Sequence, residues 1–505
     1  MSSNQLQSVN HVVVLMLENR SFDHMLGFLY ATTGNISPLT GSPFEGLTGT
    51  ESNLQADGTP VEVAELSPNG ANVYFTPGAD PGEGYAATNI QLFGTTSPGP
   101  QAVPTNAGFV IDFAETLSGT DADQAIVAGT VVSDIMGMFT PTLLPVLAGL
   151  ARGYAVCDHW YASVPTETFP NRAFANAATS QGHMNDATAR FTSPSIFGLL
   201  SQHGLAWSIY GYDAPPLTRL DFTDIENAPD ANFGEFSDFQ AAASAGTLGV
   251  YTFLEPSWGS SGNSQHPNYD VALGEQLIYD VYHALRTGPG WHETLLVIAY
   301  DEHGGCYDHV PPPGGATPPD DVVGEFGFDF TRFGVRVPAV LVSPLIEPGT
   351  VFRPSGMVPL DHTSVLKTVE LRWGLPSLTG RDAAAPDLGD ALTLTVPRTD
   401  DPLSGVVVPS SPVANPVAGT PSHIQRVFAR LAAALPVADD LADAHPRRPE
   451  LESEDDYQAY IRSRVAKWRA WAADQRPGWS RMTNEDANEI APSTMNSFKR
   501  DDASS

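Results

Sequence analysis

Two carboxylates and an imidazole follow one another directly after an apolar run in the second half of the chain. The run is Thr294–Tyr300 (TLLVIAY), and Asp301, Glu302 and His303 come next, before two glycines. A continuous apolar run of this length, closed by glycine, is typical of a strand buried on both faces of a parallel sheet. Ligands and metals bind at the carboxyl ends of such strands. Because adjacent carboxylates are costly to bury without a positive partner, a divalent metal is the simplest candidate.

Polar residues also follow two other predicted strands. His11–Leu17 (HVVVLML) is a second apolar run, and a short third strand is expected near residues 154–157. Polar residues after one strand could occur by chance. Because three predicted strands are each followed by polar residues, we expect these side chains to lie in a single site. The polar residues that come after the second and third strands include Glu18, Asn19, Thr168, Asn171 and Arg172.

Thr168 is the candidate nucleophile. It precedes FPNR (residues 169–172) and a helical pattern, and proline is common in the first turn of a helix. A hydroxyl there would lie near unpaired N–H groups and the positive end of the helix dipole, which favour a phosphate. A metal ion or a neighbouring base would lower the pKa of the hydroxyl. The alternatives are that Thr168 only caps the helix, and that Arg172 ties two loops together instead of binding phosphate.

The same side chains suit one divalent cation. Carboxylates, an amide and a hydroxyl all offer oxygen, and an oxygen-rich set favours Mg²⁺, Ca²⁺ or Mn²⁺. Participation of His303 or His362 would shift the preference toward Zn²⁺ or iron. Taken singly, each acid is expected to be a surface or capping carboxylate, but together at strand ends they predict a metal site. The expected ligands are Glu18, Asn19, Asp301, Glu302 and Thr168.

Other histidines and acids stand near the predicted site. His266 lies in SQHPNYD, a loop before a long amphipathic pattern. It would stabilise the phosphate or protonate the leaving oxygen, unless it is simply solvated. Asp308 and His309 are expected to shape the loop that follows the acidic pair. Asp361 and His362 open a predicted helix, where capping competes with a functional role.

The composition limits the classes of partner and compartment. The chain has 505 residues and a net charge of −33, which repels nucleic acid, so no nucleic-acid partner is expected. No apolar stretch is long enough to span a membrane. No signal peptide is visible, which predicts a cytoplasmic protein or one exported by a non-standard route. Cys157 and Cys306 both flank the predicted site, so a bridge is conceivable, but free buried thiols are the expected state.

The order of predicted elements indicates an α/β fold. Strands and helices alternate through most of the chain, which favours a mostly parallel sheet with helices on both sides. Residues 31–130 are rich in glycine, proline, serine and threonine and are expected to form an irregular excursion over the functional face. We predict a catalytic domain at residues 1–397. Residues 398–505 would form a linker and two helices, 422–435 and 453–474, that pack on this domain, and a frayed tail.

Several segments together resemble a known family. They are HVVVLMLENRSFDHMLG, SVPTETFPNR, YDEHGGCYDHVPPP, GVRVPAVLVSP and DHTSVLKTVELRWG, in that order along the chain. The set is similar to the ordered motifs of the bacterial and plant non-specific phospholipase C and acid phosphatase family of phosphoesterases, over roughly residues 9–386. The resemblance implies an alkaline-phosphatase-like α/β/α sandwich with a helical C-terminal extension, and metal-assisted hydrolysis of a phosphate ester.

The resemblance also implies roles for individual residues. Thr168 would be the nucleophile that forms a phospho-enzyme, and His266 would assist the phosphate or the leaving group. Asn171 and Arg172 would structure the loop that carries the nucleophile. The metal ligands would be Glu18, Asn19, Asp301 and Glu302.

The chain departs from the family pattern in one segment. Many relatives have a histidine in a DPxHE-like segment before QL(F/Y)G, whereas this chain has DPGEGY (residues 80–85) before QLFG (91–94). The departure puts a second active-site histidine in question, and with it the preference for lipid headgroups. The first interpretation is a phospholipase C-like enzyme that cleaves a phosphodiester such as phosphatidylcholine. The alternatives are an acid phosphatase with the same nucleophile and a catalytically inactive relative.

Overall fold

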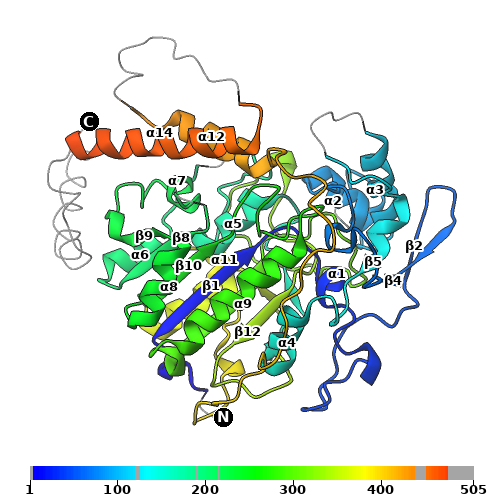
Figure 1. The fold of residues 1–505 in the computed structure, drawn as a ribbon, viewed down its shortest axis with the longest axis horizontal. Helices are drawn as coiled ribbons and strands as arrows, with labels where there is room; N and C mark the ends of the chain where they lie inside the picture. Colours follow the sequence, from blue (N-terminus) through cyan, green and yellow to red (C-terminus); the bar gives the residue numbers. More distant parts are fainter. Residues whose placement is uncertain are drawn as a thin grey trace.

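A mostly parallel sheet of eight strands forms the centre of the molecule (Figure 1). The computed structural model describes residues 4–99, 101–119, 125–187, 190–213, 215–437 and 451–475. The strand order is β13-β6-β12-β11-β1-β10-β8-β9, and of these only β12 runs antiparallel to its neighbours. The strands are β1 (His11–Leu17), β6 (Ala155–Val156), β8 (Trp207–Gly211), β9 (Phe233–Glu235), β10 (Tyr251–Glu255), β11 (Thr294–Tyr300), β12 (Ala339–Val342) and β13 (Thr350–Val351).

The two long apolar runs of the sequence are neighbouring central strands. β1 and β11 pair in parallel from His11 opposite Thr294 to Leu17 opposite Tyr300. All seven residues of β11 are buried, and so are all residues of β1 except His11. Burial on both faces explains why their hydrophobicity is continuous rather than alternating. These predicted strands are confirmed.

Helices cover both faces of the sheet (Figure 1). In one layer α9 contacts α4 and α8, and in the other α10 contacts α5 and α11 while α5 contacts α6. The predicted α/β/α sandwich is therefore confirmed. The helices of these layers are α4 (Pro145–Gly153), α5 (Thr168–Ala177), α6 (Ile196–Gln202), α8 (Phe236–Ala245), α9 (Val271–Thr287), α10 (Thr363–Trp373) and α11 (Gly380–Ala384). Smaller elements are α1 (Phe22–Leu26), α7 (Thr218–Asp221), β7 (Trp160–Tyr161) and β14 (Leu360–Asp361).

The segment 31–130 is more regular than predicted. It contains two helices that pack against each other, α2 (Tyr85–Phe93) and α3 (Phe109–Ser118). Glycines bracket α2: Gly84 precedes it, and Gly94 ends it in the left-handed region at a φ of 69°. Helices this short, set in glycine- and proline-rich sequence, lack the long periodic pattern that identifies a helix. The strands near them are β2 (Ser52–Leu54), β3 (Pro60–Glu62), β4 (Ala64–Glu65) and β5 (Gly137–Met138).

The C-terminal segment packs on the main body through two helices, α12 (His423–Ala434) and α14 (Glu454–Gln475), drawn in orange and red in Figure 1. The helices contact each other, and α12 also contacts α7. Ile461, Val465 and Trp468 of α14 are buried in the main hydrophobic core. They lie on the single stripe that the sequence pattern predicts. The tail predicted to be frayed, residues 476–505, lies outside the described residues.

Two smaller expectations concern the cysteines and the membrane. Cys157 and Cys306 are both buried and free, so the expectation of free thiols is confirmed and the conceivable bridge is not formed. Within the described ranges, no helix has the length and apolar character needed to cross a membrane.

Candidate active site

The ends of β1 and β11 bring two of the predicted acidic segments together. Because Leu17 and Tyr300 are opposite each other in the sheet, Glu18 and Asp301 leave it at the same edge. The N–H of Asp301 donates to the carbonyl of Leu17 at 3.2 Å, and the N–H of Asn19 donates to Oδ1 of Asp301 at 3.0 Å. The carboxyl ends of these parallel strands thus form a rigid base for a site.

Arg172 connects this base to α5. Its Nε donates to Oδ2 of Asp301 at 2.9 Å, and its Nη2 donates to the carbonyls of Met16 and Leu17 at 3.3 and 3.2 Å. The guanidinium lies 4.6 Å from the ring centre of Trp258. Tying the helix to two strands is therefore one role of Arg172. Its buried Nη1 has no hydrogen-bond partner within the described part of the chain, so that donor is available to a phosphate oxygen.

Thr168 is the first residue of α5 and is completely buried. Its Oγ1 donates to Oδ1 of Asn19 at 3.3 Å, which joins the nucleophile candidate to the end of β1. The N-cap residue of α5 is Glu167, so the alternative that Thr168 only caps the helix is wrong. The next N–H along, that of Phe169, donates to Oδ1 of Asp186 at 2.9 Å.

Asn171 acts on the backbone around the nucleophile. Its Nδ2 donates to the carbonyls of Val164, Thr166 and Glu167 at 3.2, 2.8 and 3.1 Å. Its Oδ1 accepts from the N–H of Val164 at 3.1 Å. The side chain is thus fully occupied in holding the loop before α5, which agrees with the structuring role that the family resemblance implies.

Buried carboxylate oxygens without partners indicate where a cation would bind. Both oxygens of Glu18 and Oε1 of Glu302 are buried and accept no hydrogen bond from any described residue. Burial raises the pKa of Glu18 to about 7 and raises the pKa of Glu302 well above its ordinary value. Burying carboxylates that lack hydrogen-bond partners costs free energy unless a positive charge compensates them. Carboxylate oxygens without partners are of the ligand type that a hard divalent metal prefers. The carboxylate of Asp301, in contrast, already accepts three hydrogen bonds.

Glu83 belongs to the site although the sequence analysis did not select it. Its Oε2 accepts from Nδ2 of Asn19 at 2.5 Å. Burial, with the charges of Asp80 and Glu302, raises the pKa of Glu83 well above its ordinary value. Glu83 stands fourth in DPGEGY, where the DPxHE pattern has its histidine. The absence of the family's histidine could have drawn attention to this position, because the position lies in the site and carries a carboxyl group in this chain.

His266 lies close to both Asp80 and Glu83. Its Nε2 is 3.8 Å from Oδ1 of Asp80, and single ligand atoms of Asp80, Glu83 and His266 all lie within 4.8 Å of one another. The charge of His266 also acts on the carboxyl of Glu18. The structure therefore brings His266 to the site, with its ring 4.8 Å from that of Tyr269.

The two histidines considered as zinc ligands have other partners. His362 is bonded through Nε2 to the carbonyl of Asp301 at 2.6 Å, and its Nδ1 accepts from Nε1 of Trp160 at 3.3 Å. Nε2 of His303 bonds Oε1 of Gln91 at 2.7 Å, and burial lowers the pKa of His303 to about 3. Both rings are therefore engaged in buried contacts with other groups.

Asp308 and His309 form a separate group. Nε and Nη2 of the buried Arg336 lie 2.9 Å from Oδ1 of Asp308 and Oδ1 of Asp23, and Nδ1 of His309 lies 2.5 Å from Oδ2 of Asp23. This network ties α1 to the loop after β11. It supports the expectation that Asp308 and His309 shape the loop.

A cavity of about 380 Å³ opens beside the acids. Its lining includes Asp80, Glu83 and Tyr269 together with residues of the C-terminal segment. The cavity is polar and large enough for a small ester arm beyond the reacting phosphate.

Sequence comparison defines the class of protein to which this fold and site belong. Residues 9–376 match the Phosphoesterase family, so the chain is a member of it. It is a hydrolase acting on phosphoric esters. It is 34% identical to non-specific phospholipase C3 of Arabidopsis thaliana, over 78% of this chain and 76% of that protein. It is 36% identical to non-specific phospholipase C6 of the same plant, over 80% and 76%.

A bacterial relative and a solved structure extend the comparison. Phospholipase C A of Mycobacterium tuberculosis (strain ATCC 25618 / H37Rv) is 27% identical, over 82% of this chain and 84% of that protein. Among solved structures, a protein in the alkaline phosphatase superfamily from Vibrio parahaemolyticus matches 48% of this chain and 64% of its own, at 13% identity and a TM-score of 0.31. An overlap this partial carries no weight for function.

Proposed function

We propose that the protein cleaves a phosphodiester such as phosphatidylcholine by phospholipase C-like hydrolysis, with Thr168 as the nucleophile and one divalent metal ion as the cofactor. The observation that carries the proposal is the hydrogen bond from Thr168 to Asn19, made at the start of α5 and beside buried acids that lack partners. The residues that would hold the metal are Glu18, Asn19, Asp301, Glu302 and Thr168.

The chain's own groups would act in sequence on the phosphate. Thr168 gives its hydroxyl proton to solvent and attacks phosphorus as the alkoxide, so that a bond from its Oγ1 to phosphorus forms and the bond to the leaving alcohol breaks. Nη1 of Arg172, which has no partner among the described residues, receives a phosphoryl oxygen. His266 supplies the proton that the leaving alcohol takes, and water then hydrolyses the phosphothreonine. A bound divalent ion would lower the pKa of the Thr168 hydroxyl and withdraw charge from the phosphoryl group.

The cavity favours a diester over a monoester. A phosphomonoester needs no room beyond its phosphate and alcohol, whereas a cavity of about 380 Å³ is lined by Glu83, whose carboxyl group is bonded to Asn19. Asp80, Glu83 and the ring of Tyr269 line that space together with His423 and Arg426, so its walls offer polar groups to the headgroup of a diester. An acid phosphatase with the same nucleophile is the second candidate. We also infer that residues 1–397 form the catalytic domain, on which the linker and helices of the C-terminal extension pack.

Parallel assays of two substrates test this proposal. Wild type, Thr168→Ala and Thr168→Ser would be given p-nitrophenyl phosphorylcholine and p-nitrophenyl phosphate, with and without chelator. Thr287→Ala, at the exposed far end of α9, is the matched control. The expected result is diester turnover that the alanine variant loses, the serine variant partly keeps and the control retains. Turnover of the monoester alone would favour the phosphatase, and full activity of Thr168→Ala would remove Thr168 as the nucleophile.

A further inference from the structure

We propose that the C-terminal segment 417–426 is a wall of the active-site cavity, and that His423 is a positioning residue that holds the start of α5 through Asp186. The family match ends at residue 376, so this segment lies beyond it. The inference rests on the proposed function, because the helix that His423 would position carries Thr168.

The cavity beside the acids is closed by the C-terminal segment. Its lining on that side is Val417, Thr420, Pro421, Ser422, His423 and Arg426. Asp80 and Glu83 line the same cavity, and Glu83 is bonded to Asn19 of the candidate metal site. A substrate arm that leaves the phosphate through this cavity must therefore pass along the C-terminal segment.

A short chain of contacts leads from His423 to the nucleophile. Nε2 of His423 lies 3.3 Å from Oδ2 of Asp186, which is 2% exposed while the His423 side chain is 43% exposed. Oδ1 of Asp186 accepts from the N–H of Phe169 at 2.9 Å, and Phe169 follows Thr168. The N–H of Asp186 donates to Oε2 of Glu167, the N-cap residue, at 2.6 Å. One carboxylate thus connects the C-terminal helix to the first turn of α5.

Asp186 needs a counter-charge at this place. Its Oδ2 is buried and accepts no hydrogen bond from the described residues. The ion pair with His423 is the contact that compensates this oxygen. A buried carboxylate oxygen without compensation is costly and is free to rotate away from the helix. Burial lowers the pKa of His423, but the carboxyls of Asp186, Glu167 and Asp80 outweigh it and raise that pKa. The imidazolium supplies the missing charge and fixes the direction of the carboxylate.

The segment is held in place on the loop that carries His266. Nδ2 of Asn415 donates to the carbonyl of Ser260 at 2.7 Å, and the Oγ of Ser260 donates to Glu454 at 3.1 Å. Val417 packs in one apolar cluster with Tyr269, the residue whose ring faces His266. The C-terminal segment is therefore fastened to the same loop that positions the candidate acid.

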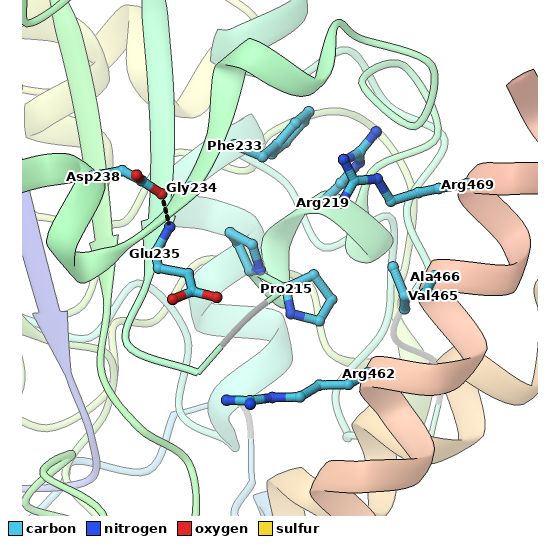
Figure 2. A pocket seen from close by; sticks show the side chains of 11 residues that line it. Pro215, Arg219, Phe233, Gly234, Glu235, Asp238, Arg462, Val465, Ala466 and Arg469 are labelled. Carbon is cyan, nitrogen blue, oxygen red and sulfur yellow. Dashed lines mark hydrogen bonds between the residues drawn. The ribbon is translucent and has the colours of Figure 1, made fainter. Parts of the chain in front are cut away.

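Helix α14 contacts the main body through residues other than His423 (Figure 2). In this view α14 faces Arg219 and Phe233 across a cavity of about 360 Å³. Oδ1 and Oδ2 of Asp230 bind Nη2 of Arg219 at 2.9 Å and Nη2 of Arg469 at 2.6 Å. The guanidinium of Arg219 also lies 5.3 Å from the ring centre of Trp468. This second anchor lets His423 be changed without releasing the extension.

A double-mutant cycle with two readouts tests the inference. The variants are His423→Ala, His423→Lys, Asp186→Asn and the double variant His423→Ala with Asp186→Asn. Arg430→Ala, an exposed position on the same helix, is the matched control. The readouts are kcat and KM for p-nitrophenyl phosphorylcholine, and amide hydrogen exchange over residues 164–174 of each intact chain.

His423→Ala is expected to lower kcat about tenfold while KM changes less, because a misplaced nucleophile slows the chemical step. Exchange over 164–174 should rise in the same variant, and His423→Lys should recover part of both. In the Asp186→Asn background the alanine substitution should cost less than about twofold, and Arg430→Ala should have no effect.

Three outcomes would overturn the inference: unchanged kcat in His423→Ala, unchanged exchange over 164–174, or a full tenfold loss that persists in the Asp186→Asn background. A wild-type enzyme inactive on both nitrophenyl substrates would instead count against the proposed function. The exchange experiment would still decide the contact between His423 and the start of α5 in that case.

Discussion

The N–H of Asn19 donates a 3.0 Å hydrogen bond to the Asp301 carboxylate, and this bond joins the ends of β1 and β11 beyond the last rung of the sheet. The same carboxylate accepts from the N–H of Glu302 at 2.8 Å and from Nε of Arg172 at 2.9 Å. Asp301 therefore fixes the geometry of two strands and one helix at the point where the proposed nucleophile sits.

Replacing this carboxylate should cost stability as well as activity. Asp301→Asn keeps an acceptor for the two N–H groups but turns an amide N–H₂ toward Arg172, whose buried charge then loses its partner. We expect a loss of about 3–5 kcal/mol in the free energy of unfolding, measured by urea denaturation, and no turnover. Asp321→Asn, at an exposed position, is the control and should match wild type. Wild-type stability in Asp301→Asn would mean that the pair with Arg172 contributes nothing.

Removal of the metal should lower the stability of the folded protein, and this effect can be measured without an activity assay. An ion that binds only the folded chain stabilises it by about 2.7 kcal/mol when present at a hundred times its Kd. Dialysis against a chelator should therefore lower the thermal midpoint of wild type, and added Mg²⁺, Ca²⁺, Mn²⁺ or Zn²⁺ should restore it to different extents. Glu18→Gln should bind less metal per chain by elemental analysis and show a smaller chelator effect. Glu62→Gln, which is exposed, should behave as wild type; a chelator-insensitive midpoint would argue against a bound ion.

Some of the site could be predicted from the sequence because local signals place it. Glu18 and Asp301 each follow a strongly apolar strand, and parallel neighbours must end at the same edge of the sheet. Thr168 could be assigned to the start of a helix from the FPNR letters that follow it. In each case the strand or helix that positions the residue is adjacent to it in the chain.

Other parts of the site form through contacts between segments far apart in the chain, and no local sequence pattern predicts such contacts. Glu83 and Asn19 are 64 residues apart in the chain and meet only in the folded structure. His423 reaches Asp186 from 237 residues further along, and nothing in the letters around it distinguishes it from a solvated helix residue. The short helix α2 was missed for a related reason, since nine residues between two glycines show too little periodicity.

His362 is expected to support Asp301 without binding the metal. Its ring accepts from Trp160 at Nδ1, so the proton is on Nε2 and is donated to the Asp301 carbonyl at 2.6 Å. His362→Ala should lower the free energy of unfolding by about 1–3 kcal/mol, because two buried polar groups lose their partner. Metal content per chain should stay at the wild-type value, as it should in His203→Ala, an exposed control. A loss of metal at unchanged stability would make His362 a ligand.

Glu275 should give the folded protein a stability that falls as pH rises. Its two carboxylate oxygens accept from the N–H groups of Val146 and Leu147 at the start of α4, at 2.7 and 2.9 Å. Burial nevertheless raises the pKa of Glu275 from 4.5 to about 8. Between these values the unfolded chain has lost the proton that the folded chain keeps, so the free energy of unfolding decreases with rising pH.

The size of this effect can be measured against a variant that does not titrate there. Wild type should lose about 3 kcal/mol relative to Glu275→Gln between pH 5 and pH 7.5, in urea denaturation at matched ionic strength. Glu275→Gln is itself expected to be less stable at low pH, because its amide group can accept only one of the two N–H bonds. Glu347→Gln, exposed and far from α4 in the chain, should keep the wild-type slope. Parallel pH profiles for wild type and Glu275→Gln would show that the buried carboxyl ionises in the folded state at its ordinary pKa.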